Sequence, residues 1–223
     1  MQDQRDEIEW RDADVPVSNR FDDPYFSLDN GLEETRHVFL AGNNLPDRFQ
    51  SGFHIAELGF GTGLNLLVAL QCWRQSDQTG QLRFTSFEAF PLSPEDMLRA
   101  QMGFPALSEL SSELAPFWGE NSFETEDLRF TMIYGDARET LPIWSGMADA
   151  WFLDGFSPAK NPELWQADLL QKVSDHTKPN GTAATYTAAG IVRRDLQSAG
   201  FDVERVPGFG RKRHMTIARK APQ

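Results

Sequence analysis

The sequence predicts a doubly wound α/β domain, and three observations support this class. Apolar, strand-like segments alternate with helix-like segments from residue 53 onward. Such alternation implies parallel strands joined by right-handed helical crossovers. The first strand runs into a glycine-rich turn and then a helix, and the last two strands have no helix between them. We therefore expect a mostly parallel sheet with an antiparallel C-terminal hairpin at one side.

Seven strands and their connecting helices follow from hydrophobic patterning and from turn residues. The expected strands cover residues 53–58, 82–88, 130–134, 148–153, 181–186, 201–206 and 214–218. The expected helices cover residues 64–73, 161–173 and 190–200, with one starting at 93–95, a short one at 31–40 and a helical or irregular stretch at 104–118. Ser93-Pro94 and Asn161-Pro162 each combine an N-cap residue with a proline at the first helical position. Gly208 and Gly210 separate the last two strands and predict the turn of the hairpin.

The chain is expected to form one structural unit with an N-terminal extension. Its 223 residues suit a single domain of ordinary size. Residues 1–52 contain turn signals but no long periodic segment, so we interpret them as an N-terminal extension of the domain. Residues 53–223 form the expected domain, and seven strands ending in a hairpin are the arrangement of Rossmann-like methyltransferases.

Composition indicates a globular, cytoplasmic protein. Hydrophobic residues make up 40% of the chain, which excludes an intrinsically disordered class. No apolar run approaches the roughly 20 residues of a membrane span, and the acidic, polar residues 1–14 do not resemble a signal peptide. Cys72 is the only cysteine, so neither an internal disulfide nor a cysteine-based metal site is expected. We expect no metal cofactor and no membrane partner.

Charge is distributed unevenly along the chain. The net charge is −12, which taken alone argues against nucleic-acid binding. Residues 191–223 nevertheless carry eight basic and three acidic side chains, a net of +5, so the first 190 residues carry −17. A basic face on an acidic body is therefore compatible with the sequence.

The glycine-rich turn predicts the cofactor. Glu57 ends the first strand, and Gly59, Gly61 and Gly63 follow at alternate positions. Glycines let the main chain turn sharply and let a ligand approach it, and ligands of such sheets lie outside the carboxyl ends of the strands. A dinucleotide site would need its third glycine at position 64, where this chain has Leu64. The spacing and the acid instead favour a site for S-adenosylmethionine over a tight turn without a ligand. Glu57 could accept a hydrogen bond from the ammonium of that cofactor, directly or through water.

Two further acids end neighbouring strands. Glu88 ends the second strand, 25 residues after Gly63, and a carboxylate there can accept both ribose hydroxyls. Asp136 and Ala137 follow the third strand, where an acid can bind the adenine amino group. A solvated acid at position 88 and a plain turn aspartate at position 136 are the alternative interpretations.

Asp154 is the candidate catalytic residue. It ends the fourth strand and begins a loop that contains Phe156, Pro158 and Lys160. An amine becomes cationic as it is methylated, so a nearby carboxylate can orient it, stabilise the charge and help remove a proton. The loop shares an acid, an aromatic residue and a proline with the Asp/Asn-Pro-Pro-Tyr loop of amine methyltransferases. Asp154 could alternatively cap local amides, Lys160 could contact phosphate or be solvated, and Trp165 is expected in the core.

The chain resembles the methyltransferase domain of the bacterial MnmC family of tRNA 5-methylaminomethyl-2-thiouridine biosynthesis proteins. The residues that carry the resemblance run from about residue 10 to the C-terminus. They are Phe21-Asp-Asp-Pro-Tyr-Phe-Ser27, Asn30-Gly-Leu-Glu-Glu-Thr35, Val38-Phe-Leu40, Gly59-Phe-Gly-Thr-Gly-Leu-Asn65, Phe87-Glu-Ala-Phe-Pro-Leu92, Asp149 through Pro162, Val192-Arg-Arg194 and Gly208-Phe-Gly-Arg-Lys-Arg213. The 149–162 motif and the basic hairpin are specific to the family, whereas the glycine loop alone is not.

The resemblance implies methylation of the aminomethyl nitrogen of 5-aminomethyl-(2-thio)uridine at the tRNA wobble position. It implies that Asp154 lies nearest the substrate amine and that the 25–33 stretch helps to close the cofactor site. The cofactor contacts it implies, beyond the acids and glycines above, are Tyr25, Ser27, Thr62 and Asn65. Family members carry a second, FAD-dependent oxidase domain, for which this chain shows no second dinucleotide motif. We therefore expect a stand-alone or separated methyltransferase without FAD, served by an oxidase domain or enzyme.

The anticodon loop of tRNA is the expected macromolecular partner. Its wobble base is single-stranded, so presenting that base requires little unstacking. The basic residues expected to contact tRNA, with Phe156 at the base, are Lys160, Arg193, Arg194, Arg211, Lys212 and Arg213. A solvated, charged sheet edge is the alternative for the hairpin. Two other functions stay open at this point: methylation of a small amine or a protein side chain, and a non-catalytic tRNA-binding or cofactor-sensing module.

Overall fold

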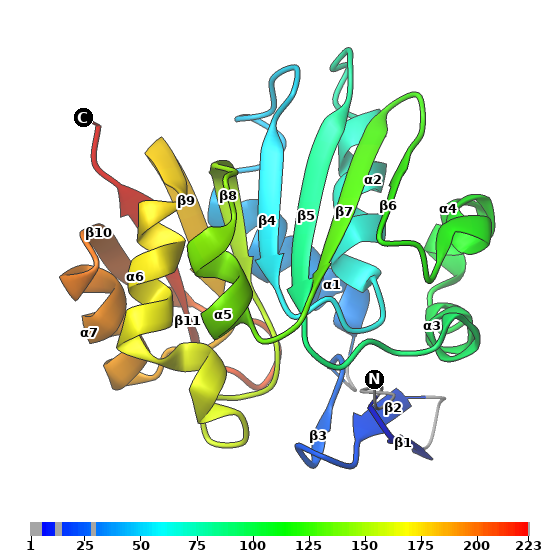
Figure 1. Ribbon diagram of the computed structural model, residues 1–223, viewed down its shortest axis with the longest axis horizontal. Coiled ribbons are helices and arrows are strands. Elements are labelled where there is room, and N and C mark those ends of the chain that lie inside the picture. The colour runs from blue at the N-terminus through cyan, green and yellow to red at the C-terminus, as the bar shows by residue number, and fades with distance from the viewer. Residues whose placement is uncertain (1–5, 12–14, 28–29, 223) are drawn as a thin grey trace.

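The computed structural model describes residues 6–11, 15–27 and 30–222. Within them a central sheet has the strand order β10-β11-β9-β8-β4-β5-β7-β6 (Figure 1). Its strands are β4 His54–Leu58, β5 Leu82–Glu88, β6 Ser122–Glu124, β7 Leu128–Tyr134, β8 Ala148–Leu153, β9 Thr177–Thr185, β10 Phe201–Pro207 and β11 His214–Lys220. Strands β7, β5, β4, β8 and β9 pair in parallel, whereas β6, β11 and β10 pair antiparallel to their neighbours. The doubly wound class and the C-terminal hairpin are confirmed.

The seven-strand count is one short. All seven expected strands are present, but β6 adds an eighth at the edge beyond β7. It is only three residues long, and one of them, Phe123, is buried. Two exposed residues around one buried residue give too short an alternation to predict a strand. Strand β9 also starts four residues before the expected position, at Thr177.

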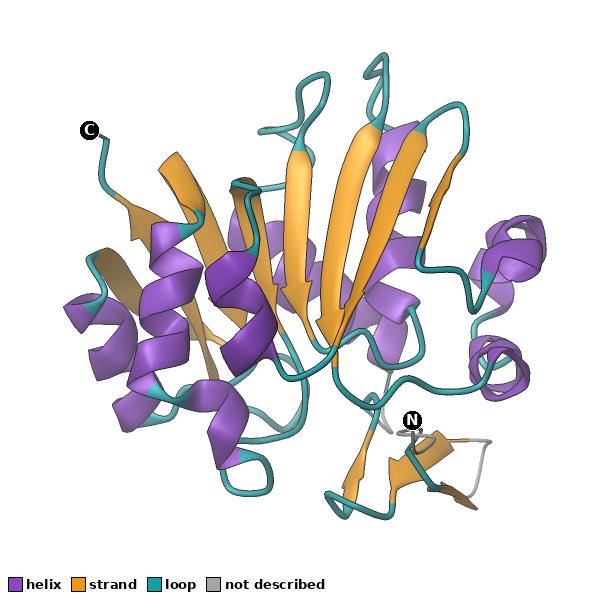
Figure 2. Ribbon diagram, in the orientation of Figure 1, coloured by secondary structure: helices purple, strands orange, loops and turns teal. Residues whose placement is uncertain are grey.

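Helices cover both faces of the sheet (Figure 2). They are α1 Gly31–Thr35, α2 Leu64–Arg74, α3 Pro94–Gln101, α4 Ser108–Leu114, α5 Ala137–Thr140, α6 Ala167–Asp175 and α7 Gly190–Ser198. Ser93 caps α3 as expected, because its hydroxyl accepts from the Asp96 amide. The 31–40 segment is α1 followed by a π-helical turn, and α5 was not expected. None of the described helices is both long and apolar enough to cross a bilayer.

The helix expected at residues 161–173 is divided in two. Pro162–Trp165 form a 3₁₀ turn, Gln166 is extended, and α6 begins at Ala167. The Asn161 side chain makes no capping hydrogen bond, so that part of the prediction is wrong. A hydrogen bond ties this 3₁₀ turn to the preceding loop instead. The Trp165 indole N–H donates to the Phe156 carbonyl oxygen over 2.9 Å. Trp165 itself is buried, as expected.

Two hydrophobic clusters pack on opposite faces of the sheet. Strand β8 contributes Phe152 to one cluster and Trp151 and Leu153 to the other. All six β8 residues are buried, as in a parallel strand covered on both faces. Phe39 and Phe49 belong to the first cluster, so part of the 1–52 segment is packed into the core. Burial of each such aromatic side chain contributes about 1.5–3 kcal/mol.

A second, three-stranded sheet lies beside the carboxyl ends of the central strands (Figure 1). Its strands are β1 Ile8–Arg11, β2 Val15–Ser18 and β3 Asp23–Pro24. The carboxyl ends of β4, β5 and β8 are adjacent because these strands pair in parallel. The acids that end these strands are therefore gathered at one edge, facing the N-terminal segment.

Candidate active site

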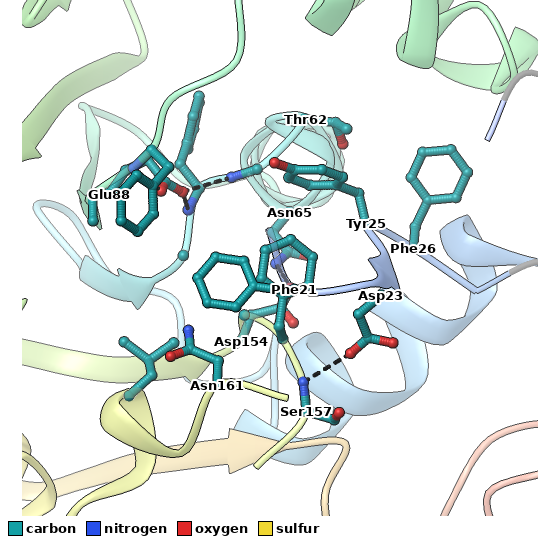
Figure 3. Close-up of a pocket in the computed structure, with 18 of the residues that line it drawn as sticks. Phe21, Asp23, Tyr25, Phe26, Thr62, Asn65, Glu88, Asp154, Ser157 and Asn161 are labelled. Carbon is teal, nitrogen blue, oxygen red and sulfur yellow. Dashed lines mark hydrogen bonds between the residues drawn. The ribbon is translucent and has the colours of Figure 1, made fainter. Parts of the chain in front are cut away.

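A cavity of about 790 Å³ lies where the carboxyl ends of β4, β5 and β8 meet the N-terminal segment (Figure 3). This volume is within the range of sites that hold a cofactor or a small substrate. Its walls come from the N-terminal segment, the glycine loop, the ends of β5 and β7, the loop after β8 and the C-terminal hairpin. The lining residues include Phe21, Asp23, Tyr25, Glu34, Thr35, Gly59, Gly61, Thr62, Asn65, Glu88, Asp136, Asp154, Phe156, Tyr186 and Lys212.

The glycine loop adopts a backbone that favours glycine at three positions. Gly59, Gly61 and Gly63 have φ values of 84°, 54° and 76°. A Cβ atom at Gly59 would lie 3.0 Å from the Cα of Gly155, and one at Gly61 would lie 3.0 Å from Cδ1 of Tyr25. The glycine loop is therefore in close contact with the N-terminal segment and with the loop that follows β8 (residues 154–161, the candidate catalytic loop). The Thr62 carbonyl oxygen accepts from Gln101 over 2.8 Å, which leaves the Thr62 side chain near the cavity.

Glu57 lies below the cavity and does not line it. Its two carboxylate oxygens accept from Asn65 Nδ2 over 2.8 Å and from Ser86 Oγ over 2.7 Å. The side chain is fully buried, and this burial raises the pKa of Glu57 well above its usual value. Glu57 therefore holds Asn65, which itself lines the cavity.

Asn65 connects the two strand-end acids. One N–H of its amide donates to Glu57 and the other to Asp154 Oδ2 over 2.7 Å (Figure 3). Its Oδ1 accepts from the Thr35 hydroxyl over 2.9 Å, so α1 also holds this amide. All three hydrogen bonds are compatible with one orientation of the side chain, which fixes the position of Asp154.

Asp154 is the titrating acid of the cavity. Burial raises the pKa of Asp154 to about 7, although hydrogen bonds from Asn65 and from the Gly155 amide act in the opposite direction. Asp154 lines the cavity, so its carboxyl group is available to a ligand there. A half-buried acid with a pKa near neutral suits proton transfer.

Glu88 ties the glycine loop to the end of β5. Its Oε2 accepts from the backbone amides of Phe60 over 2.9 Å and Gly61 over 3.2 Å, and its Oε1 accepts from Phe90 over 2.8 Å (Figure 3). Burial still raises the pKa of Glu88, against these hydrogen bonds. Glu88 lines the cavity, as a residue that accepts ribose hydroxyls must.

Asp136 has a structural role at the start of α5. Its carboxylate accepts from the Arg138 amide over 2.9 Å and pairs with the Arg138 guanidinium, which lowers the pKa of Asp136. This is the arrangement of a capping aspartate. Asp136 and the buried Ala137 nevertheless both line the cavity, next to Gly135.

Aromatic side chains join the catalytic loop to the N-terminal segment. Phe156 stacks on Phe21 with ring centroids 4.7 Å apart and meets the Tyr25 ring edge-on at 5.0 Å. The Ser157 amide donates to Asp23 over 3.0 Å (Figure 3). These contacts hold β3 and the residues around it over the cavity. Ser27 also lines the cavity, at the end of this segment.

The basic residues expected at the tRNA surface have different environments. Lys160 pairs with Asp22 over 2.6 Å and does not line the cavity. On α7, Arg193 is half-buried and Arg194 is exposed. Arg211 and Arg213 are exposed in the turn between β10 and β11, and Lys212, between them, lines the cavity. The structure therefore brings Lys212 to the candidate site and leaves the other five outside it.

Glu34 and Tyr186 line the cavity but were not predicted as site residues, although Glu34 lies within the 30–35 motif. Glu34 pairs with Lys212 over 2.8 Å, and the Lys212 ammonium lies 4.1 Å from the centre of the Tyr186 ring. Tyr186 follows β9, so the rule that pointed to acids at strand ends could have indicated it. Glu34 comes from a five-residue helix, and no sequence signal identified its direction. Within the described ranges, no cluster of three or more potential metal ligands is present.

Comparisons with known proteins give a consistent relationship. Residues 107–221 match the family model described as S-adenosyl-L-methionine-dependent methyltransferase. The chain is 43% identical to the tRNA 5-methylaminomethyl-2-thiouridine biosynthesis bifunctional protein MnmC of Aliivibrio fischeri over 93% of its length, and 43% identical to that of Hahella chejuensis over 95%. It covers only 34% and 36% of those proteins, so it spans about a third of their length.

A solved structure agrees with this relationship. The crystal structure of MNMC2 from Aquifex aeolicus is similar with a TM-score of 0.78 and 28% sequence identity. The match covers 98% of this chain and 72% of that one. The similarity therefore extends over the central sheet, the N-terminal segment and the C-terminal hairpin together.

Proposed function

The chain belongs to the S-adenosyl-L-methionine-dependent methyltransferase family, and from this membership we propose that it methylates the aminomethyl nitrogen of 5-aminomethyl-(2-thio)uridine at the tRNA wobble position. The product is 5-methylaminomethyl-(2-thio)uridine. The resemblance to MnmC seen in the sequence is confirmed by relatives that are 43% identical. The observation that carries the proposal is Asp154, a half-buried acid that lines the cavity and has a pKa raised to about 7.

The residues of the cavity fit S-adenosylmethionine. The positive φ angles at Gly59 and Gly61 let a ligand approach the main chain closely. Glu88 and Asp136 line the cavity, where Glu88 can accept ribose hydroxyls and Asp136 is proposed to bind the adenine amino group. S-adenosylmethionine supplies an electrophilic methyl group on a cationic sulfur, and the acidic lining suits a cation. Asn65, held by Glu57, can orient the amino-acid end, with Thr62, Ala137, Tyr25 and Ser27 completing the proposed contacts. Gly63, also predicted from the sequence, does not line the cavity and instead shapes the turn of the loop.

Asp154 would prepare the amine for attack. A primary amine is protonated at neutral pH and has no free electron pair in that form. An ionised Asp154 can accept one N–H proton of this ammonium, which leaves the nitrogen with a free electron pair for the methyl group that S-adenosylmethionine would supply. Asn65 holds Asp154 in place during this transfer. Most of the remaining rate enhancement comes from alignment of the two reactants.

The surface around the cavity mouth would hold tRNA. Arg211 and Arg213 are exposed beside the inward Lys212, and Arg193 and Arg194 follow the end of β9 on α7. We propose that these side chains contact phosphates of the anticodon arm, while Phe156 contacts the base. Lys160 is a weaker candidate, since Asp22 already pairs with it.

The N-terminal segment, residues 1–52, is proposed to cover the cofactor, with residues 53–223 as the methyltransferase domain. Tyr25 and Phe21 support this division, because they line the cavity and pack on Phe156. We further propose that a FAD-dependent oxidase domain or separate enzyme supplies the aminomethyl substrate, because the relatives are bifunctional. We also propose that the protein acts on tRNA in the cytoplasm.

Nucleoside analysis tests the proposal. Purified protein is incubated with S-adenosylmethionine and tRNA that carries 5-aminomethyl-2-thiouridine, and the digested nucleosides are analysed by mass spectrometry. We expect gain of one methyl group at the modified uridine and none without the cofactor. An unchanged nucleoside contradicts the proposal. Methylation of free amines or proteins with no salt dependence would indicate the small-amine alternative, and cofactor binding without any acceptor would indicate a non-catalytic module.

A further inference from the structure

The turn between β10 and β11 places a lysine at the cavity. The Gly208 amide donates to the Arg213 carbonyl oxygen over 3.1 Å, and the Lys212 amide donates to that of Phe209 over 3.0 Å. A Cβ atom at Gly208 would lie 2.2 Å from the Lys212 carbonyl oxygen, so only glycine fits this close approach. The turn is therefore tight, and its Lys212 side chain lines the cavity whereas Arg213 does not.

Glu34 receives this lysine from the opposite wall. Its side chain is in a residue only 9% exposed, and its Oε1 accepts from the Lys212 ammonium over 2.8 Å. The adjacent Thr35 donates to Asn65, the same amide that donates to Asp154. Glu34 is consequently held one residue away from the hydrogen-bond network of the candidate catalytic acid.

Tyr186 supplies the third contact. Its hydroxyl donates to the Gly155 carbonyl oxygen over 2.8 Å, which fixes the ring beside the catalytic loop. The Lys212 ammonium lies 4.1 Å from the centre of this ring. A carboxylate on one side and an aromatic face on the other are the contacts by which proteins bind a primary ammonium group.

The same region is close to Asp154. Glu34 raises the pKa of Asp154 and Lys212 lowers it, so both charges act on the candidate catalytic acid. Glu34, Tyr186, Lys212 and Asp154 all line one cavity. A cation between Glu34 and Tyr186 is therefore near the group that would take its proton.

We propose that Glu34 and the face of Tyr186 form the subsite that receives the protonated aminomethyl group of the substrate, and that the ammonium of Lys212 occupies this subsite until tRNA binds. The inference rests on the proposed function, because that function makes the acceptor a primary amine. Lysine and aminomethyl-uridine both present a primary ammonium on a short flexible stem. Lys212 thus takes the place of the substrate in the free protein.

This arrangement gives a reason for selectivity toward tRNA. Arg213 and its neighbours on the turn are exposed, so tRNA phosphates can attract the turn and give Lys212 a new anionic partner. A free amine has no phosphates and must displace Lys212 from Glu34 unaided. Discrimination then comes from an element that disfavours the wrong ligand, in addition to contacts with the right one.

The test compares two nucleosides that differ by one amino group. Binding of 5-aminomethyluridine and of 5-methyluridine is measured by NMR titration without cofactor. The variant Lys212→Met keeps the apolar stem of the side chain and removes its charge. The aminomethyl nucleoside should bind this variant about fivefold more tightly, because it no longer has to displace a half-exposed ion pair and a cation–π contact. Affinity for 5-methyluridine should not change, which also shows that the variant is folded.

Two further variants complete the test. Glu34→Gln in the Lys212→Met background should remove the preference for the aminomethyl nucleoside. Arg213→Met, on the same turn but outside the cavity, should leave nucleoside affinity unchanged. Equal affinity of Lys212→Met and the original protein for the aminomethyl nucleoside overturns the inference, and so does a preference that survives Glu34→Gln.

The outcome is separable from that of the proposed function. If tRNA is methylated but Lys212→Met does not change nucleoside binding, the subsite is wrong and the function stands. If Lys212→Met reveals an ammonium preference but tRNA is not methylated, the subsite stands and the tRNA function is wrong.

Discussion

The acids at the ends of β4 and β8 accept hydrogen bonds from the same amide, but only one of them is accessible from the cavity. Glu57 accepts from Asn65 and Ser86, is fully buried and does not line the cavity. Asp154 accepts from the same Asn65 amide but lines the cavity. Burial raises the pKa of both.

The difference separates an orienting acid from a reacting one. A carboxylate whose oxygens are both engaged by protein donors holds its neighbours in place, and Glu57 does this for Asn65. Glu88 combines both roles, because it accepts from two backbone amides of the glycine loop and one after β5 and also lines the cavity. Asp154 retains acceptor capacity toward the cavity, and this makes it the candidate for proton transfer.

The largest effect is expected from Asp154→Asn. The amide cannot take a proton from the acceptor amine, so kcat for tRNA methylation should fall by about 10²–10⁴-fold. Affinity for S-adenosylmethionine should change by about twofold or less, because the fold and the glycine loop stay intact. Single-turnover assays and cofactor titration measure the two quantities. A variant that keeps its full rate would show that Asp154 is a structural turn residue.

Substitution of Glu57 should lower the free energy of unfolding more than it changes the rate of methylation. Glu57→Ala leaves the Asn65 amide and the Ser86 hydroxyl without their partner, so the free energy of unfolding should fall by about 1–3 kcal/mol. Glu57→Gln is the matched control, since its amide oxygen can accept from Asn65 while its NH₂ group donates to Ser86. Urea denaturation compares the variants. Loss of cofactor affinity in a stable Glu57→Gln protein would mean that the charge of Glu57 itself binds the ligand.

The pH dependence of turnover reports the ionisation of Asp154. Its raised pKa of about 7 means that the carboxyl group is protonated, and unable to accept a proton, on the acid side of that value. The rate should therefore fall about tenfold per pH unit below the pKa and level off above it. Single-turnover rates from acid to mildly alkaline pH measure this limb. A limb that persists in Asp154→Asn must belong to another group.

Lys160 should give the smallest change. Its ammonium is paired with Asp22 at the surface, where such pairs contribute little. We expect Lys160→Met to alter KM for tRNA by about twofold or less, whereas Arg213→Met should raise KM clearly and reduce its salt dependence. Methylation kinetics at two salt concentrations provide the comparison. A large rise in KM for Lys160→Met would place Lys160 at the tRNA surface.

Sequence patterns located the strand ends but not the state of the side chains there. Glu57, Glu88 and Asp154 were predicted because acids follow parallel strands, and the structure places all three strand ends at one edge. Which of them has free acceptor capacity depends on donors from elsewhere in the chain, such as Ser86 and Thr35. Those contacts have no local signal in the sequence.

Side-chain direction explains most of what was missed. The sequence did not distinguish Arg211, Lys212 and Arg213, of which the tight turn brings only Lys212 to the cavity. Their contact with tRNA stays a prediction. Glu34 belongs to a five-residue helix, too short for periodicity to show its buried face. Strand β6 and the 3₁₀ turn before α6 likewise depend on packing against residues distant in sequence.

The contact between Gly59 and Gly155 has an evolutionary consequence. A side chain at position 59 would collide with the candidate catalytic loop. The spacing between a methyl donor at the glycine loop and an amine acceptor at Asp154 therefore cannot change through a single substitution there. Lys212 on the hairpin turn and Glu34 on α1 are under no such constraint, because they meet each other through their side chains. Substitution at those two positions is thus an accessible route by which this scaffold could acquire a new acceptor while conserving its reaction geometry.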